Sequence, residues 1–256
     1  MIENLIGFRT LVKREVLRFF VVFSQTLVAP LVSSTLFIFV FGYSLGGRMN
    51  LMIHGVPYLN FIIPGLVMMH LIESPYANTS SSLFMSRWHN LIQEILLSPL
   101  SYFEMVLGLL IGGITRGLLI GSGVYGVSLF FCQFSFYSWP VVVYFFCLVT
   151  LIFALLGLLV GLWAEGFDRL SFWSTFVLTP LVYFGGVFHS VDMMPVPLQW
   201  VAHLNPIFYF VSGLRYGMLG ISDVDVRISM ALAAGMAAVL FVVVERLFRN
   251  GYKLRS

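Results

Sequence analysis

Charged residues are scarce in this chain of 256 residues. Asp, Glu, Lys and Arg together make up 10% of the sequence, whereas the hydrophobic fraction is 59%. A soluble domain carries roughly 25% charged residues. A chain so poor in charge cannot cover its own surface for water, so its outer face must meet lipid. The scarcity excludes a soluble domain, and we expect a single membrane domain over residues 1–256.

Lysine is almost absent. The only two lysines are Lys13 and Lys253, and neither follows a glycine. A P-loop needs a glycine-rich turn that ends in Gly-Lys-Ser/Thr, because its backbone N–H groups and its lysine hold the phosphates of a nucleotide. The chain therefore lacks that route to ATP hydrolysis. We expect no enzymatic activity of its own and no cofactor bound by this chain.

Cysteine is equally rare. Cys132 and Cys147 both fall in apolar segments, and no cysteine or histidine cluster has the spacing of a metal site. We interpret both thiols as small apolar side chains inside membrane helices. The sequence predicts no metal site.

Long apolar runs are abundant, and the mean hydropathy is +0.96. A membrane helix needs ~20 mostly apolar residues, and lipid tolerates only a backbone whose polar groups are satisfied internally. The expected fold class is therefore an all-α polytopic membrane protein with six transmembrane helices. The six segments are Phe20–Leu45, Tyr58–Ser80, Met105–Phe131, Trp139–Trp163, Leu170–Phe188 and Ile228–Val244.

The basic residues are distributed unevenly between the two sides of these segments. If the N-terminus is cytoplasmic, only Arg48, Arg215 and Arg227 lie outside, and Arg116 lies within a span. The other ten of the fourteen are cytoplasmic: Arg9, Lys13, Arg14, Arg18, Arg87, Arg169, Arg246, Arg249, Lys253 and Arg255. The positive-inside rule therefore predicts that both termini are cytoplasmic, with a basic tail over residues 245–256.

Residues 1–20 form a predicted helix ahead of the first span. Leu5, Phe8, Val12, Val16 and Phe19 recur at helical spacing, and the basic residues occupy other faces. This pattern is typical of an amphipathic helix on the cytoplasmic membrane surface, with its basic groups near anionic lipid. The helix could be an anchor that sets the topology, or an elbow that also contacts a cytoplasmic partner.

The longest cytoplasmic stretch between spans is Ser81–Glu104. Its residues Leu91, Ile92, Ile95 and Leu96 make a narrow apolar face on a short helix. Pro99 should end that helix. Such a helix can lie on the membrane or insert into a groove of a partner, and periodicity alone does not decide between these roles.

The outer stretch from Phe188 to Gly220 contains three prolines but is too apolar for a solvated loop. Short re-entrant helices before the last span would fit, if protein covers their free backbone groups. The aromatic residues Tyr183, Phe184 and Phe188 end the fifth span, where they could form a constriction or an interfacial belt.

Three ionisable residues fall within predicted spans: His70, Glu73 and Arg116. Intramembrane ionisable groups are costly and are therefore candidate functional groups. They could form a proton relay or a substrate contact, or Glu73 and Arg116 could be a structural pair. A relay would make the chain a proton-coupled secondary transporter, although its halves show no convincing repeat of the kind common in such folds.

Three motifs occur in a familiar order. They are Ile63-Pro64-Gly65-Leu66, Gln93-Glu94-Ile95-Leu96-Leu97-Ser98-Pro99-Leu100-Ser101 and Asn205-Pro206-Ile207-Phe208-Tyr209. With the N-terminal helix and six spans, the chain resembles the permease subunit of an ABC-2 type transporter over nearly its whole length. The segment Glu94–Ser101 is the most specific of the three.

The resemblance implies two kinds of protein partner, a second copy of the chain and separate ATPase subunits. Two permease copies would pair, and two separate ATP-binding cassette ATPase subunits would bind beneath them and hold ATP and Mg. The first, second and fifth spans would line a path between the copies, capped on the outer side by residues 188–220, with Asn205 and Pro206. The coupling helix to the ATPase would comprise Arg87, Trp88, Leu91, Ile92, Glu94, Ile95, Leu96 and Pro99.

The resemblance also implies a function and a location. We expect ATP-driven export of a lipophilic or lipid-linked substrate across a bacterial inner membrane, with membrane lipids but no nucleic acid as further partners. A Leu96→Asp substitution would then uncouple ATP hydrolysis from transport. The proton-coupled transporter built on His70, Glu73 and Arg116 is the alternative.

Overall fold

The computed structural model describes residues 2–41, 52–132 and 136–254, with side chains from Asn4 onward. The end of the predicted first span (42–45), Arg48 and Arg255 lie outside these ranges. The elements follow in the order α1 (Ile2–Val21), η1 (Ser24–Val28, π-helical), α2 (Ala29–Phe39), β1 (Met52–Ile53), β2 (Val56–Pro57), α4 (Tyr58–Trp88), α5 (Ile92–Leu97), α6 (Tyr102–Ser128), α7 (Trp139–Trp163), α8 (Phe167–Phe172), η3 (Trp173–Leu178, π-helical), α9 (Thr179–Phe184), η4 (Val191–Met193, 3-10), α10 (Val196–Leu204), α11 (Pro206–Leu219) and α12 (Val226–Arg249).

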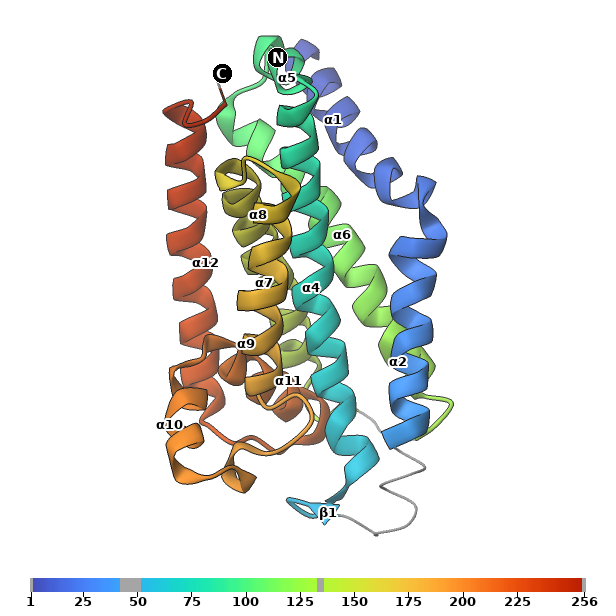
Figure 1. Ribbon diagram of the computed structural model, residues 1–256. Coiled ribbons are helices and arrows are strands. Elements are labelled where there is room, and N and C mark those ends of the chain that lie inside the picture. Colours follow the sequence, from blue (N-terminus) through green and yellow to red (C-terminus); the bar gives the residue numbers. More distant parts are fainter. Residues whose placement is uncertain (1, 42–51, 133–135, 255–256) are drawn as a thin grey trace.

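The helices form an elongated bundle whose two termini lie at the same end, beside α5 (Figure 1). We call this the N/C end. The antiparallel pair β1–β2, in which Ile53 pairs with Val56, lies at the opposite end with α10, and we call that the hairpin end. The shared position of the termini is what an even number of crossings would give.

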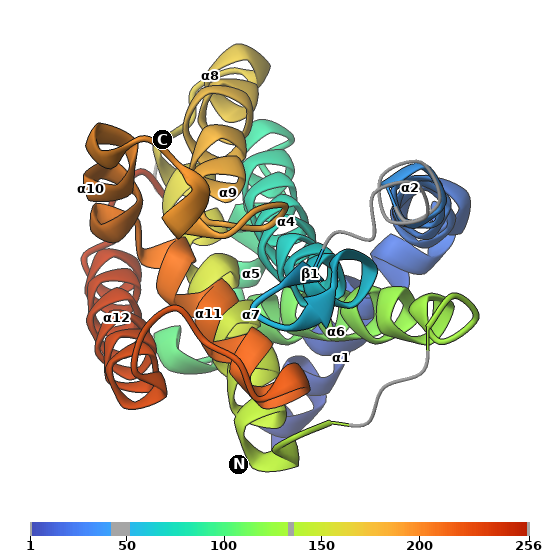
Figure 2. The ribbon, with the colours of Figure 1, turned by 90° about the horizontal axis from the view of Figure 1, so that it is seen from below.

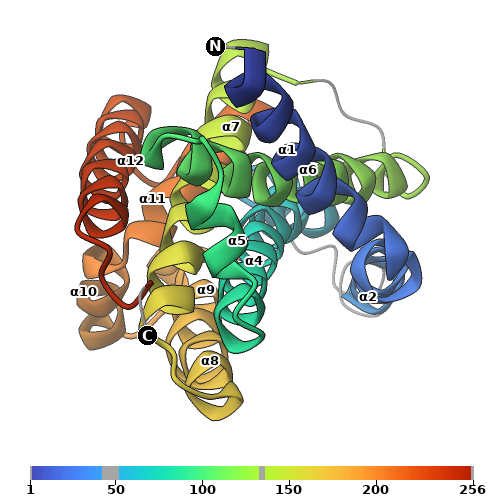
Figure 3. The same ribbon diagram turned by 90° about the horizontal axis from the view of Figure 1, so that it is seen from above.

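Helix α4 lies inside the bundle. It packs against α6 and α7, and end views show it between α2 on one side and α8–α9 on the other (Figures 2 and 3). Many of its polar residues are covered by neighbouring helices: the Thr79 hydroxyl, for example, donates to the Ala154 carbonyl of α7 at 2.8 Å. Buried polar residues of this kind are tolerated because the neighbouring helices satisfy their hydrogen bonds.

Glycines let the three central helices approach closely. A Cβ on Gly113 of α6 would lie 2.6 Å from the Thr79 side chain, and one on Gly121 would lie 2.5 Å from Leu71. On α7, a Cβ on Gly157 would lie 2.1 Å from the Thr79 hydroxyl oxygen. Small residues one turn apart are typical of helix contacts in membranes. The glycine series Gly113, Gly117 and Gly121 is such a pattern.

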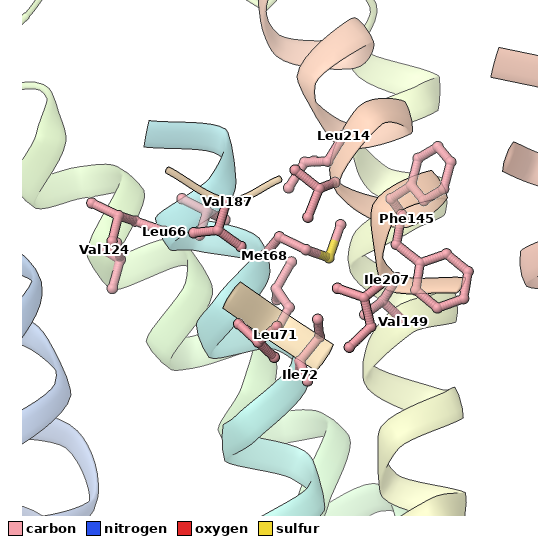
Figure 4. Close-up of a cluster of buried hydrophobic side chains, with 14 of the residues drawn as sticks. Leu66, Met68, Leu71, Ile72, Val124, Phe145, Val149, Val187, Ile207 and Leu214 are labelled. Atoms are coloured by element: carbon pink, nitrogen blue, oxygen red, sulfur yellow. The ribbon is translucent and has the colours of Figure 1, made fainter. Parts of the chain in front are cut away.

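The hydrophobic core lies where α4, α7 and α11 meet. Figure 4 shows Met68 and Ile72 of α4 with Phe145 of α7 and Ile207 of α11, and all four are at most 1% exposed. Val187, which follows α9, enters the same cluster. Its carbonyl oxygen would lie 2.2 Å from a Cβ at position 65. The Pro64-Gly65 motif therefore marks a close approach of backbone that only glycine permits.

Three helices are long and apolar enough to cross a membrane: α6, α7 and α12. They match the predicted third, fourth and sixth spans. The segments Asn4–Val21 and Ser24–Phe39 meet this criterion together but are bent by 77°, so the predicted first span begins at a sharp bend after α1. Among the described residues, three helices, or four if the bent pair counts as one, are thus long and apolar enough to cross a membrane.

The remaining two predicted spans differ from simple apolar helices. Helix α4 has 31 residues but is rich in polar side chains, and the predicted fifth span is divided into α8, η3 and α9. The outer stretch contains two helices, α10 and the 14-residue α11. Six spans and a re-entrant outer segment stay predictions.

Candidate functional site

The N-terminal helix is attached to the central helix by a buried carboxylate. Glu15 of α1 is fully buried, and its carboxylate accepts a hydrogen bond of 2.6 Å from the Ser82 hydroxyl of α4. Arg18 donates to the Asn78 carbonyl at 2.6 Å. A Cβ on Gly112 of α6 would lie 2.7 Å from the Cβ of Glu15, so α1, α4 and α6 meet at this point. Movement of α1 must therefore move α4.

Glu15 was not among the residues that the sequence singled out. The predicted apolar face comprised Leu5, Phe8, Val12, Val16 and Phe19. Phe19 is buried, but Leu5 is 68% exposed, and the buried series is Leu11, Glu15 and Phe19. The signal for Glu15 was an acidic residue one turn from two apolar residues in a helix that is mostly basic.

The predicted coupling helix is shorter than expected. Arg87 and Trp88 end α4, a turn at Asn90 with a φ of 59° follows, and α5 begins at Ile92. As predicted, α5 ends before Pro99, since Ser98 adopts an extended conformation. A reciprocal pair of hydrogen bonds between Ser101 and Glu104 then begins α6.

The apolar face of α5 points into the chain's own core. Ile92 and Ile95 are buried in a cluster that includes Leu11 of α1, and Leu96 packs against the same cluster. Leu96→Asp would therefore disturb the fold of the chain itself. The exposed residues at this turn and helix include Trp88, Leu91, Glu94 and Leu97, and we call these four the coupling surface; Leu97 is 87% exposed.

Arg87 holds the coupling surface to α7 and to the tail. Its guanidinium donates to the carbonyls of Gly161 and Leu162 at 2.8 Å each, and to that of Lys253 at 2.9 Å. These carbonyls include orphan acceptors of the last turn of α7. A cleft of about 260 Å³ lies between Arg87, Trp88 and Ile92 on one side and residues of the tail on the other. Arg87 thus connects the end of α4 to the end of α7 and to the tail.

The tail is further fixed by Glu165. Its carboxylate accepts a hydrogen bond of 2.7 Å from the Lys253 ammonium and also pairs with Arg169. The hydrogen bond from Lys253, together with the charges of Arg169 and Lys253, lowers the pKa of Glu165 below its ordinary value. Both pairs are solvent-exposed, so each contributes little to stability.

One side of α4 is less covered than the rest of the helix. Between Phe61 and Ser86 every residue of this helix is buried except Met69, Glu73, Ala77, Ser81 and Met85. These five recur every fourth residue and so lie along one side of the helix. We call them the open stripe. It leads from the N/C end toward the hairpin end.

The three intramembrane ionisable residues do not form a network. The His70 ring nitrogen shares a hydrogen bond of 2.6 Å with the Ser34 hydroxyl of α2. Among the described residues, no hydrogen bond or ion pair joins Glu73 to Arg116 or either of them to His70. The Nε atom of Arg116 is buried without a partner in the part of the chain that the structure describes. His70 therefore links α2 to α4, while Glu73 belongs to the open stripe.

Aromatic rings connect α2 to α9 at the hairpin end. The ring of Phe188 lies 5.7 Å from that of Phe37, 6.0 Å from that of Phe41 and 5.6 Å from that of Tyr183. These are distances of favourable aromatic packing. Phe184, also predicted at this site, directly follows Tyr183 in the sequence and is 38% exposed. We call Phe37, Phe41, Tyr183 and Phe188 the aromatic cluster.

A buried arginine fixes the outer segment beneath this cluster. Arg215 of α11 is 1% exposed; it forms an ion pair of 2.8 Å with Asp223 and donates to the Gly186 carbonyl at 2.7 Å. Its guanidinium carbon lies 3.8 Å from the centre of the Phe61 ring. Cation–π contacts of this kind strengthen when they are desolvated. The sequence showed Arg215 but not its partner.

The carboxylate of Asp223 also faces His54 and Asp192. One ligand atom from each of the three lies within 4.8 Å of the others, a spacing that could hold a metal ion. The positive charge of the buried Arg215 already neutralises Asp223, which weakens the attraction for a further cation. We therefore assign this group to the fixation of the outer segment.

Asn205 and Pro206 act at the start of α11. The Asn205 side chain accepts a hydrogen bond from the Ile207 N–H at 3.0 Å and donates to the Leu181 carbonyl of α9 at 2.6 Å. This is an N-cap followed by proline at the first helical position. The motif thus joins α11 to α9, and its role in the structure is to position the outer segment.

Comparisons with known proteins identify relatives of this chain. The family model described as ABC-2 type transporter matches residues 6–219. The chain is 39% identical to the inner membrane transport permease YadH of Escherichia coli strain K12 over 251 residues, which cover 98% of each chain. It is 26% identical to nodulation protein J of Neorhizobium galegae over 230 residues, 88% of this chain and 86% of the relative. It is 29% identical to nodulation protein J of Rhizobium leguminosarum bv. trifolii over 195 residues, 74% of this chain and 73% of the relative.

Proposed function

Because the chain belongs to the ABC-2 type transporter family, we propose that it is the permease subunit of an ATP-driven exporter. Two copies pair in the membrane, and two separate ATPase subunits bind at the N/C end and supply ATP hydrolysis. The N/C end is cytoplasmic, in keeping with the basic residues gathered there. The membrane is a bacterial inner membrane, as the name of the Escherichia coli relative says of that protein.

In this proposal α4 and the segment Phe167–Phe184 also cross the membrane. At 1.5 Å per residue, α4 is about 46 Å long, which exceeds the ~30 Å of a hydrocarbon core. The polar residues of α4 are tolerated there because α6 and α7 cover them. With the bent pair, α6, α7 and α12, these give the six crossings that the sequence predicts. Helices α10 and α11 then dip into the outer leaflet as a re-entrant segment.

The observation that carries the proposed partner is the coupling surface. Trp88 is 54%, Leu91 44% and Leu97 87% exposed at the N/C end, next to the polar tail and beyond the apolar part of the bundle. Large apolar side chains gathered at such a place mark a protein contact. Because α5 is buried on its other face, a partner that moves this surface also moves α4 and α6.

The open stripe supports the location of the path. We propose that the stripes of two copies face a shared path, which the aromatic cluster closes at the hairpin end. ATP binding draws the two ATPase subunits together, α5 and α1 transmit that movement to α4, and the path opens outward. The bistable element is the interface between the two permease copies.

The same residues indicate the substrate class. Met69, Ala77 and Met85 of the open stripe are apolar, and the cluster beyond them is aromatic. Such a lining suits a lipophilic or lipid-linked substrate, with Glu73 as the one ionisable group that it meets on the stripe.

The test is a comparison of two surface variants. Leu97→Asp should leave the permease folded, because the side chain is exposed, but should reduce binding of the ATPase and ATP-driven translocation of a fluorescent phospholipid in proteoliposomes by at least about tenfold, as expected for a desolvated contact. Phe130→Asp is the matched control, since Phe130 is 88% exposed near the end of α6 at the hairpin end.

Two outcomes would contradict the proposal. Equal ATPase binding by wild type and Leu97→Asp would show that the coupling surface does not contact the ATPase. Translocation that continues without ATP but stops when a protonophore dissipates the proton gradient would instead indicate the proton-coupled mechanism.

A further inference from the structure

A second apolar feature lies beside α7, and none of the five residues of the open stripe forms part of its wall. Helix α12 and the segment α8–α9 lie apart in both side and end views (Figures 1 and 2), and α7 packs against α12. A groove of about 320 Å³ occupies this place, within the ~300–1,000 Å³ range of ligand pockets. Its lining includes Phe153 and Val160 of α7, Leu178 of η3, Ile207 of α11 and Met236 of α12. We call it the lateral groove.

The length of the lateral groove matches one leaflet of a bilayer. Along α7 it extends from Trp163, the last residue of the helix, back to Phe153. Ten residues of helix correspond to roughly 15 Å, which is half of the ~30 Å hydrocarbon core. A single aliphatic chain that enters from the leaflet at the N/C end would fill the groove from end to end.

The groove contains one buried polar group that lacks a partner. Tyr76 of α4 lines it and is 5% exposed, and within the described residues its hydroxyl has no hydrogen-bond partner. A buried hydroxyl without a partner is unfavourable, because it has lost its hydrogen bonds to water without replacing them. The hydroxyl of tyrosine can donate to a carbonyl. An occupant that brings an ester or amide carbonyl to this depth would remove that cost.

The mouth of the groove has the residues of a membrane interface. Trp163 and Trp173 line this end, with their rings 6.2 Å apart, and the guanidinium carbon of Arg169 lies 5.6 Å from the centre of the Trp163 ring. Tryptophan and arginine are enriched where helices leave the hydrocarbon core. Arg169 also pairs with Glu165, so it offers a phosphate a hydrogen-bond donor rather than a free charge.

We propose that the lateral groove is a binding site for one acyl chain of a membrane phospholipid from the leaflet at the N/C end. The chain lies along α7, its carbonyl accepts a hydrogen bond from Tyr76, and its headgroup lies beside Trp163 and Arg169. Bound in this way, the lipid fills the space between α12 and the α8–α9 segment. It is a resident lipid, distinct from the exported substrate, because none of the five residues of the open stripe lines the groove.

The experiment is photolabelling of the full-length chain in vesicles of phosphatidylglycerol that carries a diazirine in one acyl chain. Lipid that merely surrounds the protein can reach exposed residues such as Phe176 and Val239, which are 67% and 64% exposed. Only a chain inside the groove can reach Phe153, Leu178 and Ile207, which are at most 8% exposed. Peptide mapping should show label on this second set.

Two variants on the same helix provide the contrast. Met236→Trp fills the groove and should reduce label on the buried set by at least tenfold, while Val239→Trp, on the exposed side of α12, should leave it unchanged. Val177→Trp fills the groove from η3 and replaces Met236→Trp if that variant does not elute as a single folded species. Tyr76→Phe keeps the shape and removes the donor, so label should fall about threefold to tenfold.

The proposal is overturned if label is confined to Phe176 and Val239 in the wild-type chain. It is equally overturned if label on the buried set is the same in both groove-filling variants as in wild type. The labelling needs neither ATP nor an ATPase, so its failure leaves the proposed export function untouched. Conversely, loss of the coupling contact in Leu97→Asp would not change the label.

Discussion

The two sides of α4 differ in their side chains and in how closely they pack. One side is closed: Thr79 donates to Ala154, and Gly113 of α6 and Gly157 of α7 leave no room for a single additional carbon. The other side, the open stripe, carries Met69, Glu73, Ala77, Ser81 and Met85, and none of these is fully buried. One helix therefore combines a face that cannot move relative to its neighbours with a face that can contact a substrate.

The difference shows how a movement at the N/C end could reach the middle of the membrane. Packed interfaces transmit displacement because they tolerate little deformation. The closed face makes α4, α6 and α7 a rigid unit, and Glu15 and Arg87 join that unit to α1 and to the tail. What changes shape is then the open side.

The largest expected effect is on the closed face. Gly157→Ala puts a Cβ 2.6 Å from the Tyr76 carbonyl oxygen and 2.1 Å from the Thr79 hydroxyl oxygen, and such overpacking costs about 1–3 kcal/mol. We expect a lower melting temperature and loss of the monodisperse species in detergent. In Gly126→Ala no atom lies within 4 Å of the new Cβ, and this control should be neutral or slightly stabilising. Equal behaviour of the two variants would refute the close approach.

A bulky residue on the open stripe should affect transport and not folding. Ala77 is exposed on α4, so Ala77→Trp should keep the melting temperature of the wild type but reduce translocation of a fluorescent phospholipid by about tenfold or more, because it fills a lining position of the path. Ala234→Trp, at an exposed position of α12, is the control and should translocate normally. A destabilised Ala77→Trp would show that the stripe is not open.

The next effect is that of the charge on the stripe. Glu73 has no ion-pair partner among the described residues, so Glu73→Gln should change ATP-driven translocation by no more than roughly threefold, the scale of one polar contact. Arg116→Gln, off the stripe on α6, should have no larger effect. Complete loss of translocation in either variant, with ATP hydrolysis intact, would revive the proton-relay hypothesis.

The smallest effect concerns the tail. The pKa of Glu165 is lower in the folded chain than its ordinary value, because Lys253 and Arg169 favour the charged form. Its contribution to stability is therefore fully present above the ordinary pKa and is lost as the pH falls through the lowered value. From about pH 6 to about pH 3, the melting temperature of wild type should fall slightly more than that of Glu165→Gln. If the melting temperatures of the two proteins changed equally with pH, the Glu165–Lys253 pair would not contribute to the attachment of the tail.

Much of the fold could be predicted from the sequence, but fewer of the contacts between helices could. Apolar length located α6, α7 and α12, and Pro99 marked the end of α5. These features depend on local chemistry, which composition and capping residues record. The family resemblance is confirmed by the match over residues 6–219.

What the sequence did not reveal depends on which helix lies opposite. The spacing of Ile92 and Ile95 defined a face of α5, but not that the chain's own α1 covers it. Glu73 and Arg116 lie in neighbouring helices, yet their side chains do not meet, since helical rotation decides which residues face each other. Glu15 carried a visible signal, an acidic residue on the buried side of a basic helix, whereas the Asp223 partner of Arg215 required the folded loop.

The central claim is that two copies of this chain work with two separate ATPase subunits. The most direct test is to purify the tagged chain from its own membranes in mild detergent, identify the proteins that accompany it, and measure the mass of the complex. The account predicts an ATP-binding cassette ATPase at equal stoichiometry, two copies of each chain, lost in Leu97→Asp and retained in Phe130→Asp. A monomer or homodimer without an ATPase, under conditions that preserve transport, would contradict it.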